Sequence, residues 1–201
     1  MSVFLKIDLS YPELRSLEKV VKVLQDGGLI VYPTDSMYVL GCKLSNKGAL
    51  NRIRRIRKLS EKHQFTIMCN DLSSLSKYAL VSNSAYRILK AHTPGPYTFI
   101  LKAKPRLPRH LMYMKKRTIG MRVPVTTIAN RLVSMFGEPI LSTSLILPSL
   151  KTPLVSPDDI SLELDNSVDS IIAGGEGGSQ PAYFGYRPHR TYIKICDKRF
   201  R

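Results

Sequence analysis

The sequence has few cysteines and no long apolar run, and both absences narrow the class of protein. Cys42, Cys69 and Cys196 stand far apart and are not spaced with histidines as zinc ligands usually are. Apolar runs such as residues 28–31 and 145–147 are only a few residues long, and the N-terminus lacks a signal-peptide stretch. We therefore expect a cytoplasmic protein with no membrane span, no disulfide scaffold and no metal site.

Acidic residues are also scarce. The 201 residues include 15 Asp and Glu against 31 Lys and Arg, which gives a formal net charge of +16 at pH 7. A field of this sign attracts polyanions, so nucleic acid, nucleotides and anionic membrane surfaces are the candidate partners. Charge that serves only solubility is the alternative explanation. With 43% hydrophobic residues, a chain of this length is predicted to bury one core as a single domain.

The familiar catalytic signatures are missing as well. The sequence contains neither Gly-x-x-x-x-Gly-Lys-Ser/Thr nor Gly-x-Gly-x-x-Gly, and it lacks Gly-x-Ser-x-Gly and His-Glu-x-x-His. His63, His92, His110 and His189 are isolated from one another, and we expect a structural or surface role for each. Any chemistry must therefore come from side chains outside these motifs.

Helices and strands are predicted to alternate along the chain. Apolar residues recur at helical spacing over residues 14–24 before Gly27 and Gly28, while Asn46 can cap a second helix and Gly137 can end a third over residues 125–136. Residues 82–91 predict a further helix. Short apolar segments predict strands at residues 3–7, 29–32, 65–68, 97–102, 118–123 and 140–144. This alternation indicates an α/β domain whose helices cover a mostly parallel or mixed sheet.

Polar side chains follow several of the predicted strands, where ligands of open α/β sheets usually bind. Residues 33–41 are predicted to be a loop that carries hydroxyls and a carboxylate after a buried strand, although turn chemistry also explains them. Arg122 stands at the end of another strand, and residues 142–144 place three hydroxyls at the end of a third. These strand ends are the candidate site.

One predicted helix carries five cations within seven positions. Because like charges repel on a helix, the sequence favours an anion nearby, with a solvated basic face as the alternative. The residues expected to contact phosphates are Arg52, Arg54, Arg55, Arg57 and Lys58.

Four motifs in this order resemble the YrdC-like family, and more closely its YciO branch. They are Gly28-Leu-Ile-Val-Tyr-Pro-Thr-Asp-Ser-Met-Tyr-Val-Leu-Gly41, Thr93-Pro-Gly-Pro-Tyr-Thr-Phe-Ile-Leu101, Gly120-Met-Arg-Val-Pro124 and Glu138-Pro-Ile-Leu-Ser-Thr-Ser144. The resemblance runs from about Gly27 to Gly178. It implies a single YrdC-like domain over residues 5–181, with a twisted mixed sheet, flanking helices and a basic central cavity.

The resemblance also implies a function. The family is described as binding double-stranded RNA and as threonylcarbamoyl-AMP synthase, which joins L-threonine, bicarbonate and ATP for tRNA modification. No covalently bound cofactor is implied, and Mg²⁺ would accompany ATP as substrate. Carried over by position, Thr34, Arg122 and Ser144 would bind substrate. The nucleotide or RNA would contact Thr143 and the five cations, Arg52, Arg54, Arg55, Arg57 and Lys58.

Two departures separate the chain from the synthase pattern. Leu59 stands where the pattern has an arginine, and Ile146 stands where it has an asparagine. The alternative function is therefore a non-catalytic accessory factor that binds or helps to process double-stranded RNA or tRNA.

The family likeness ends after Pro181. Residues 182–201 form an atypical tail in which the expected strand of the type Pro-Thr-Thr-Val-Ile-Asp-Leu is absent. A shift of the reading frame is one explanation, and a native divergent end is the other. Only residues 192–195 of the tail show an alternation typical of a strand.

Overall fold

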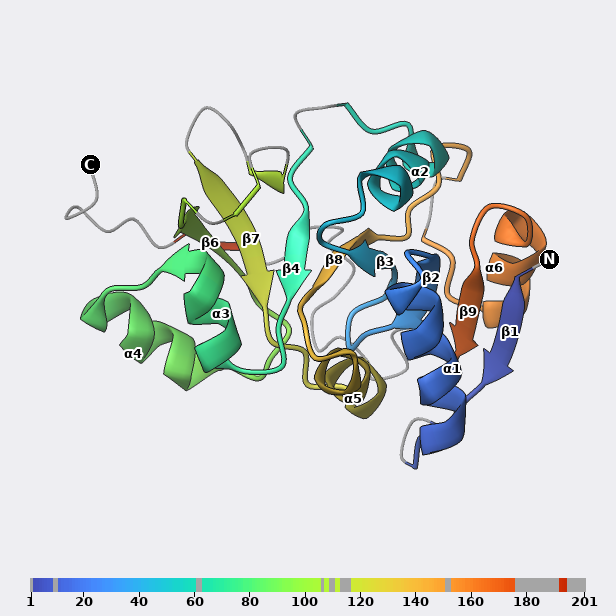
Figure 1. Cartoon of the computed structure of the whole chain (residues 1–201), viewed down its shortest axis with the longest axis horizontal. Coiled ribbons are helices and arrows are strands. Elements are labelled where there is room, and N and C mark those ends of the chain that lie inside the picture. Colours follow the sequence, from blue (N-terminus) through green and yellow to red (C-terminus); the bar gives the residue numbers. More distant parts are fainter. Residues whose placement is uncertain are drawn as a thin grey trace.

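A single mixed sheet forms the centre of the computed structural model, which describes residues 2–8, 11–60, 63–105, 107–108, 111–112, 117–150, 153–175 and 192–194 (Figure 1). The strands are β1 (Val3–Lys6), β2 (Leu29–Pro33), β3 (Tyr38–Lys43), β4 (Thr66–Met68), β5 (Ala79–Leu80), β6 (Thr98–Ala103), β7 (Thr118–Arg122), β8 (Ile140–Ser144), β9 (Ser170–Ala173) and β10 (Tyr192–Lys194). The helices are α1 (Leu14–Gln25), α2 (Lys47–Arg57), α3 (Leu72–Tyr78), α4 (Asn83–His92), α5 (Thr127–Phe136) and α6 (Pro157–Leu164).

The strand order is β1-β9-β2-β3-β8-β4-β7-β6-β10, and β5 pairs with β6. β9 runs parallel to β1 and β2, β4 parallel to β7, and β10 parallel to β6. The pairs β2–β3, β3–β8, β4–β8, β5–β6 and β6–β7 are antiparallel. The predicted α/β class with a mixed sheet is therefore confirmed.

Strand β2 shows how the core is divided. Ile30 and Tyr32 pack in one apolar cluster, whereas Leu29 and Val31 pack in the other. Because alternate residues of a strand point to opposite faces, the two clusters lie on the two sides of the sheet. Helices α1 and α5 supply side chains to the first cluster, and α2 and α6 supply side chains to the second. Helices on both faces explain why β2 is a continuous apolar run.

Local residues set where several helices begin and end, as predicted. The Asn46 side chain accepts a hydrogen bond from the Ala49 amide at the start of α2 and donates one of 2.7 Å to the Gly27 carbonyl oxygen. Gly27 has a φ of +85°, and a Cβ there would lie 2.3 Å from Asn46 Nδ2. Gly137 ends α5 with a φ of +76°. One side chain thus both caps α2 and ties it to the turn before β2.

Part of the predicted loop over residues 33–41 is wrong. Only residues 34–37 connect strands, because Tyr38–Lys43 forms β3, a central strand between β2 and β8. β3 is almost wholly buried on both faces, so it has none of the alternation that marks a half-exposed strand. The elements α3, β5, α6 and β9, which have eight residues or fewer, were not predicted from the sequence.

The prediction of an atypical tail over residues 182–201 falls mostly outside the described residues. The structure does not describe residues 176–191 and 195–201. The described segment Tyr192–Lys194 is β10, which pairs with Thr98–Ile100 of β6 at the edge of the sheet.

From the sequence we expected no disulfide scaffold, no metal site and no membrane span, and the structure describes the cysteines and helices that these expectations concern. Cys42 and Cys69 are buried free thiols, and burial raises the pKa of each to about 12. Neither is therefore a thiolate nucleophile at neutral pH. Over the described ranges, no three His, Cys, Asp or Glu side chains are grouped to hold a metal ion. No helix in these ranges is long and apolar enough to cross a bilayer.

Candidate functional site

A small pocket is lined by residues of β3, β4, β6, β7 and β8 and by Ser36 of the turn before β3. About 20 Å³ of its space can hold the centre of a water molecule, which is room for about one water. Among the described residues that line it, Arg122 is the only charged one and six others carry hydroxyls. The lining residues are Ser36, Val39, Thr66, Met68, Thr98, Arg122, Ser142, Thr143 and Ser144.

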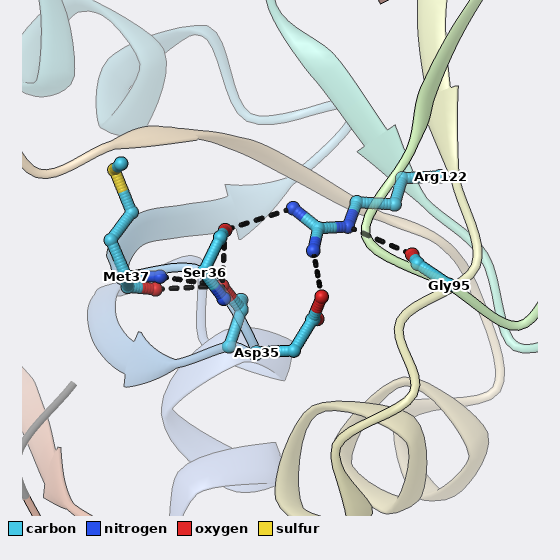
Figure 2. A network of polar contacts seen from close by, with 6 residues as sticks. Asp35, Ser36, Met37, Gly95 and Arg122 are labelled. Carbon is cyan, nitrogen blue, oxygen red and sulfur yellow. Dashed lines mark hydrogen bonds and ion pairs between the residues drawn. The ribbon is translucent and has the colours of Figure 1, made fainter. Parts of the chain in front are cut away.

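Arg122 is held in this pocket by a buried ion pair. Its Nη2 lies 2.5 Å from Asp35 Oδ2, and the two side chains are 7% and 9% exposed. Nη1 donates a hydrogen bond of 3.1 Å to Ser36 Oγ, and Nε donates one of 3.4 Å to the Gly95 carbonyl oxygen. Figure 2 shows the guanidinium between the residue 34–37 turn and Gly95. Three different nitrogens are thus fixed by three different partners.

Thr34 closes the turn that presents Asp35 and Ser36. Its Oγ1 donates a hydrogen bond of 2.7 Å to the Met37 carbonyl oxygen and accepts 3.3 Å bonds from the amides of Ser36 and Met37 (Figure 2). A hydroxyl that bonds its own turn in this way is typical of Ser and Thr. The structure therefore brings two of the predicted substrate residues, Arg122 and Ser144, into the pocket. Thr34 lies beside the pocket with its hydroxyl engaged in the turn.

Two buried tyrosines connect strands near the pocket. Tyr32 OH lies 2.7 Å from Ser142 Oγ, and burial raises the pKa of Tyr32 well above its ordinary value of 10.0. Tyr38 OH donates a 2.6 Å hydrogen bond to the Gly175 carbonyl oxygen and accepts one from the Gly174 amide, and burial raises its pKa too. Both phenols stay neutral at ordinary pH. They act as fixed hydrogen-bonding groups that join β2 to β8 and β3 to the end of β9.

The five cations that were predicted to bind phosphate, four on α2 and Lys58 directly after it, have different surroundings. Arg52, which was expected to contact phosphate, has an acidic partner in the structure, because its Nη1 lies 2.6 Å from Asp169 Oδ2. That partner is far away in sequence, so the repulsion argument could not include it. Arg54 lies over the Phe65 ring, 5.9 Å from its centroid. Arg55 and Lys58 are exposed.

Arg57 and His63 both contact the side chain of Thr143. Arg57 Nη1 donates a 2.8 Å hydrogen bond to Thr143 Oγ1, and its Nε donates one of 2.9 Å to the Ile146 carbonyl oxygen. His63 Nε2 lies 3.1 Å from the same Thr143 oxygen. The predicted nucleotide residues Arg57 and Thr143 are therefore in contact. His63 was expected to be isolated, and no spacing in the sequence signals its approach to a strand 80 residues away.

The two departures from the synthase pattern are both close to Arg57, since Leu59 follows it by two residues and the Ile146 carbonyl oxygen accepts its hydrogen bond. Leu59 is partly buried and packs against the core, so it offers no polar group to the pocket. Ile146 has a side chain that is 36% exposed, and it serves the site through the backbone oxygen that accepts the Arg57 hydrogen bond.

The pairing of Arg52 with Asp169 predicts a pH dependence of stability. Burial by itself raises the pKa of Asp169. Hydrogen bonds from Arg52 and from the Leu29 amide, together with the Arg52 charge, outweigh burial and bring this pKa below the ordinary 3.8. A depressed folded-state pKa contributes stability that is complete above the unfolded value and is lost on acidification. The stability difference between wild type and Asp169→Asn should therefore shrink as the pH falls below 3.8. Urea unfolding over a pH series measures it, and a difference that grows in acid would contradict the assignment.

Known proteins share both the sequence and the fold of this chain. Residues 22–182 match the Sua5_yciO_yrdC family model, described as telomere recombination. The chain is 49% identical over 197 residues to the uncharacterised protein YciO of Escherichia coli (strain K12), covering 98% of this chain and 92% of YciO. It is 30% identical over 179 residues to a threonylcarbamoyl-AMP synthase of Vibrio vulnificus (strain YJ016), covering 88% of this chain and 95% of the synthase.

Solved structures agree with the sequence matches. The crystal structure of E. coli YciO superimposes with a TM-score of 0.87 at 47% identity and covers 98% of this chain and 92% of YciO. P. abyssi Sua5, solved in complex with L-threonine, shares the fold with a TM-score of 0.83 at 21% identity, covering 96% of this chain and 54% of Sua5. The predicted resemblance to YrdC-like proteins is confirmed, and the chain belongs to the Sua5/YciO/YrdC family.

Proposed function

We propose that the chain binds L-threonine in the Arg122 pocket and, with ATP and bicarbonate, forms threonylcarbamoyl-AMP. The observation that carries the proposal is a buried guanidinium at a pocket that is otherwise lined largely by hydroxyls. A guanidinium binds a carboxylate through charge-assisted hydrogen bonds, and the surrounding hydroxyls can bond both the amino acid hydroxyl and phosphate oxygens.

Two relatives support the choice of substrate. One is the Vibrio vulnificus protein that is named threonylcarbamoyl-AMP synthase, and the other is P. abyssi Sua5, which was solved with L-threonine. The E. coli relative YciO is uncharacterised, so its similarity supports the fold and the family.

The proposed reaction requires that the threonine carbamate and ATP be aligned and that the negative charge of the phosphates be neutralised. In the proposed reaction a carbamate oxygen of N-carboxythreonine attacks the α-phosphorus of ATP, and the bond from that phosphorus to pyrophosphate breaks. Arg57 and His63 both contact Thr143, and in this proposal they supply donors for phosphate oxygens. We propose that Arg57 with His63 takes the place of the guanidinium that is missing at Leu59.

Threonine is larger than the pocket as it stands, because the space suffices for about one water. Binding therefore requires side chains or the residue 34–37 turn to move. Ser36, which lines the pocket on that turn, is exposed to solvent.

Threonine-dependent release of pyrophosphate from ATP tests the proposal. With bicarbonate present, the wild-type protein is expected to release pyrophosphate only when L-threonine is added. Loss of one charge-assisted hydrogen bond costs about 1.5–3 kcal/mol, so Arg122→Gln should lower kcat/KM about 10- to 100-fold. Leu59→Arg, which restores the guanidinium of the pattern, should raise the rate.

The non-catalytic alternative has its own signature. If wild type and Leu59→Arg both release no pyrophosphate while the protein binds duplex RNA with an affinity that falls steeply with salt, the accessory-factor function replaces the synthase. Arg55 on α2 and Lys58 directly after it are exposed, and they would then be the first phosphate contacts to replace.

A further inference from the structure

A surface groove is formed by the edge strand β1 and helix α6. It has a volume of about 560 Å³, which is in the range of ordinary ligand sites, and it shares no lining residue with the Arg122 pocket. Its apolar members are Phe4, which is partly buried, and Leu162, which is 84% exposed. The other lining residues follow at helical spacing along α6 and the turn after it, and they are Asp158, Ser161, Asp165 and Asn166. The groove therefore presents both apolar and acidic groups to solvent.

Strand β1 has an open edge beside this groove. It is the first strand in the order of the sheet, and among the described residues it pairs only with β9 (Figure 1). The amides of Val3 and Ile7 donate hydrogen bonds of 3.0 and 2.9 Å to carbonyl oxygens on the β9 side. Because the backbone groups of successive residues alternate between the two edges of a strand, the amides of Phe4 and Lys6 point to the open edge. Phe4 thus offers its ring to the groove and its amide to the open edge.

The charge beside this groove is opposite in sign to that of the whole chain. Residues 158–169 hold five of the 15 acidic residues and no Lys or Arg, although the chain has a net charge of +16. Of these five, only Asp169 forms an ion pair with another described residue, Arg52. Such a segment repels a nucleic acid or an anionic membrane and attracts a basic partner. A second copy that used the same edge would bring two acidic segments together, so charge disfavours that occupant too.

We propose that this edge is a docking site for a partner protein, which adds an extended basic segment to β1 as a further strand. Main-chain hydrogen bonds to the Phe4 and Lys6 amides align the segment. Side chains on one face of the added strand meet the groove, where an apolar one contacts Phe4 and Leu162 and a Lys or Arg reaches Asp158. The site does not involve the Arg122 pocket, so this inference is independent of the proposed function.

A synthetic peptide of alternating lysine and valine tests the site on the wild-type protein. A second peptide, in which serine replaces each lysine, is the reference. The basic peptide is expected to bind about 10-fold more tightly than the reference, although the net charge of the chain repels it, and to slow hydrogen exchange of the Phe4 and Lys6 amides. Fluorescence anisotropy and amide exchange measure the two effects. Equal or tighter binding of the reference peptide, or unchanged exchange at these amides, would overturn the inference.

Two matched pairs of variants separate the backbone from the charge. Lys6→Pro removes an amide that faces the open edge, where proline is tolerated, and should weaken binding of the basic peptide about 10-fold. Lys6→Gln removes the same charge but keeps the amide, and should bind at least as tightly as wild type. If the two variants bind equally, no strand is added.

The second pair reverses one acidic charge at the groove and one elsewhere. Asp158→Lys, at an exposed residue in the first turn of α6, should also weaken binding of the basic peptide about 10-fold. Glu18→Lys, at an exposed residue of α1, makes the same change of charge away from the groove and should keep the wild-type affinity. Equal effects of these two variants would show that only net charge matters and would overturn the inference. Release of pyrophosphate should be unchanged in all four variants, so failure here leaves the proposed function standing.

Discussion

Arg122→Ala should lower the free energy of unfolding by about 3–5 kcal/mol and abolish measurable threonine binding. The stability loss arises because Asp35, only 9% exposed, would keep its charge in the protein interior without its partner. The hydrogen bonds from the guanidinium to Ser36 and to the Gly95 carbonyl would be lost as well. Urea unfolding at neutral pH measures the first effect, and threonine titration measures the second.

A double variant separates the charge from the packing. In Arg122→Ala/Asp35→Ala no uncompensated charge remains, so its stability should exceed that of Arg122→Ala alone. Arg55→Ala is the matched control, since Arg55 is exposed on α2 and its loss should change stability by about 0.5 kcal/mol or less. A cost of less than about 1 kcal/mol for Arg122→Ala would show that the ion pair is solvated and would argue against the buried pair described here.

Phe65→Ala is the second substitution with a large expected effect. Phe65 is 1% exposed, and its ring meets the His63 ring edge to face at a centroid distance of 5.1 Å and lies beneath the Arg54 guanidinium. Truncation of a buried phenylalanine leaves a cavity and costs about 3–5 kcal/mol of unfolding free energy. Loss of the ring also removes the surface against which His63 rests beside Thr143. Thermal and urea unfolding measure the stability loss.

Two controls show whether the cavity or the aromatic contact matters. Phe65→Leu keeps most of the volume and should cost less than about 1.5 kcal/mol. Tyr11→Ala removes an aromatic ring that is 87% exposed and should leave stability within about 0.5 kcal/mol of wild type. Equal losses for Phe65→Ala and Tyr11→Ala would contradict the position of Phe65 in the core.

The sequence was informative wherever a signal is local or periodic. Helical spacing in α1 and α5, the cap at Asn46 and the ending glycine at Gly137 depend on residues a few positions apart, and the structure has these features where they were predicted. The four motifs also sufficed to identify the family. β3 was missed for a physical reason, because a strand buried between two layers of helices has no polar face to mark its period.

The composition of the site was decided by tertiary structure. Strand pairing brings residues 142–144 close to Arg122, and the turn before β3 adds Ser36. Only folding places Asp35 against that guanidinium. The same holds for the cations of α2, whose partners lie far along the chain at Asp169 and Thr143. By itself, the sequence determined the fold class and the family, and it predicted the candidate site at Arg122 and Ser144. The partners of each charged side chain depend on long-range packing, which the spacing of residues along a chain does not encode.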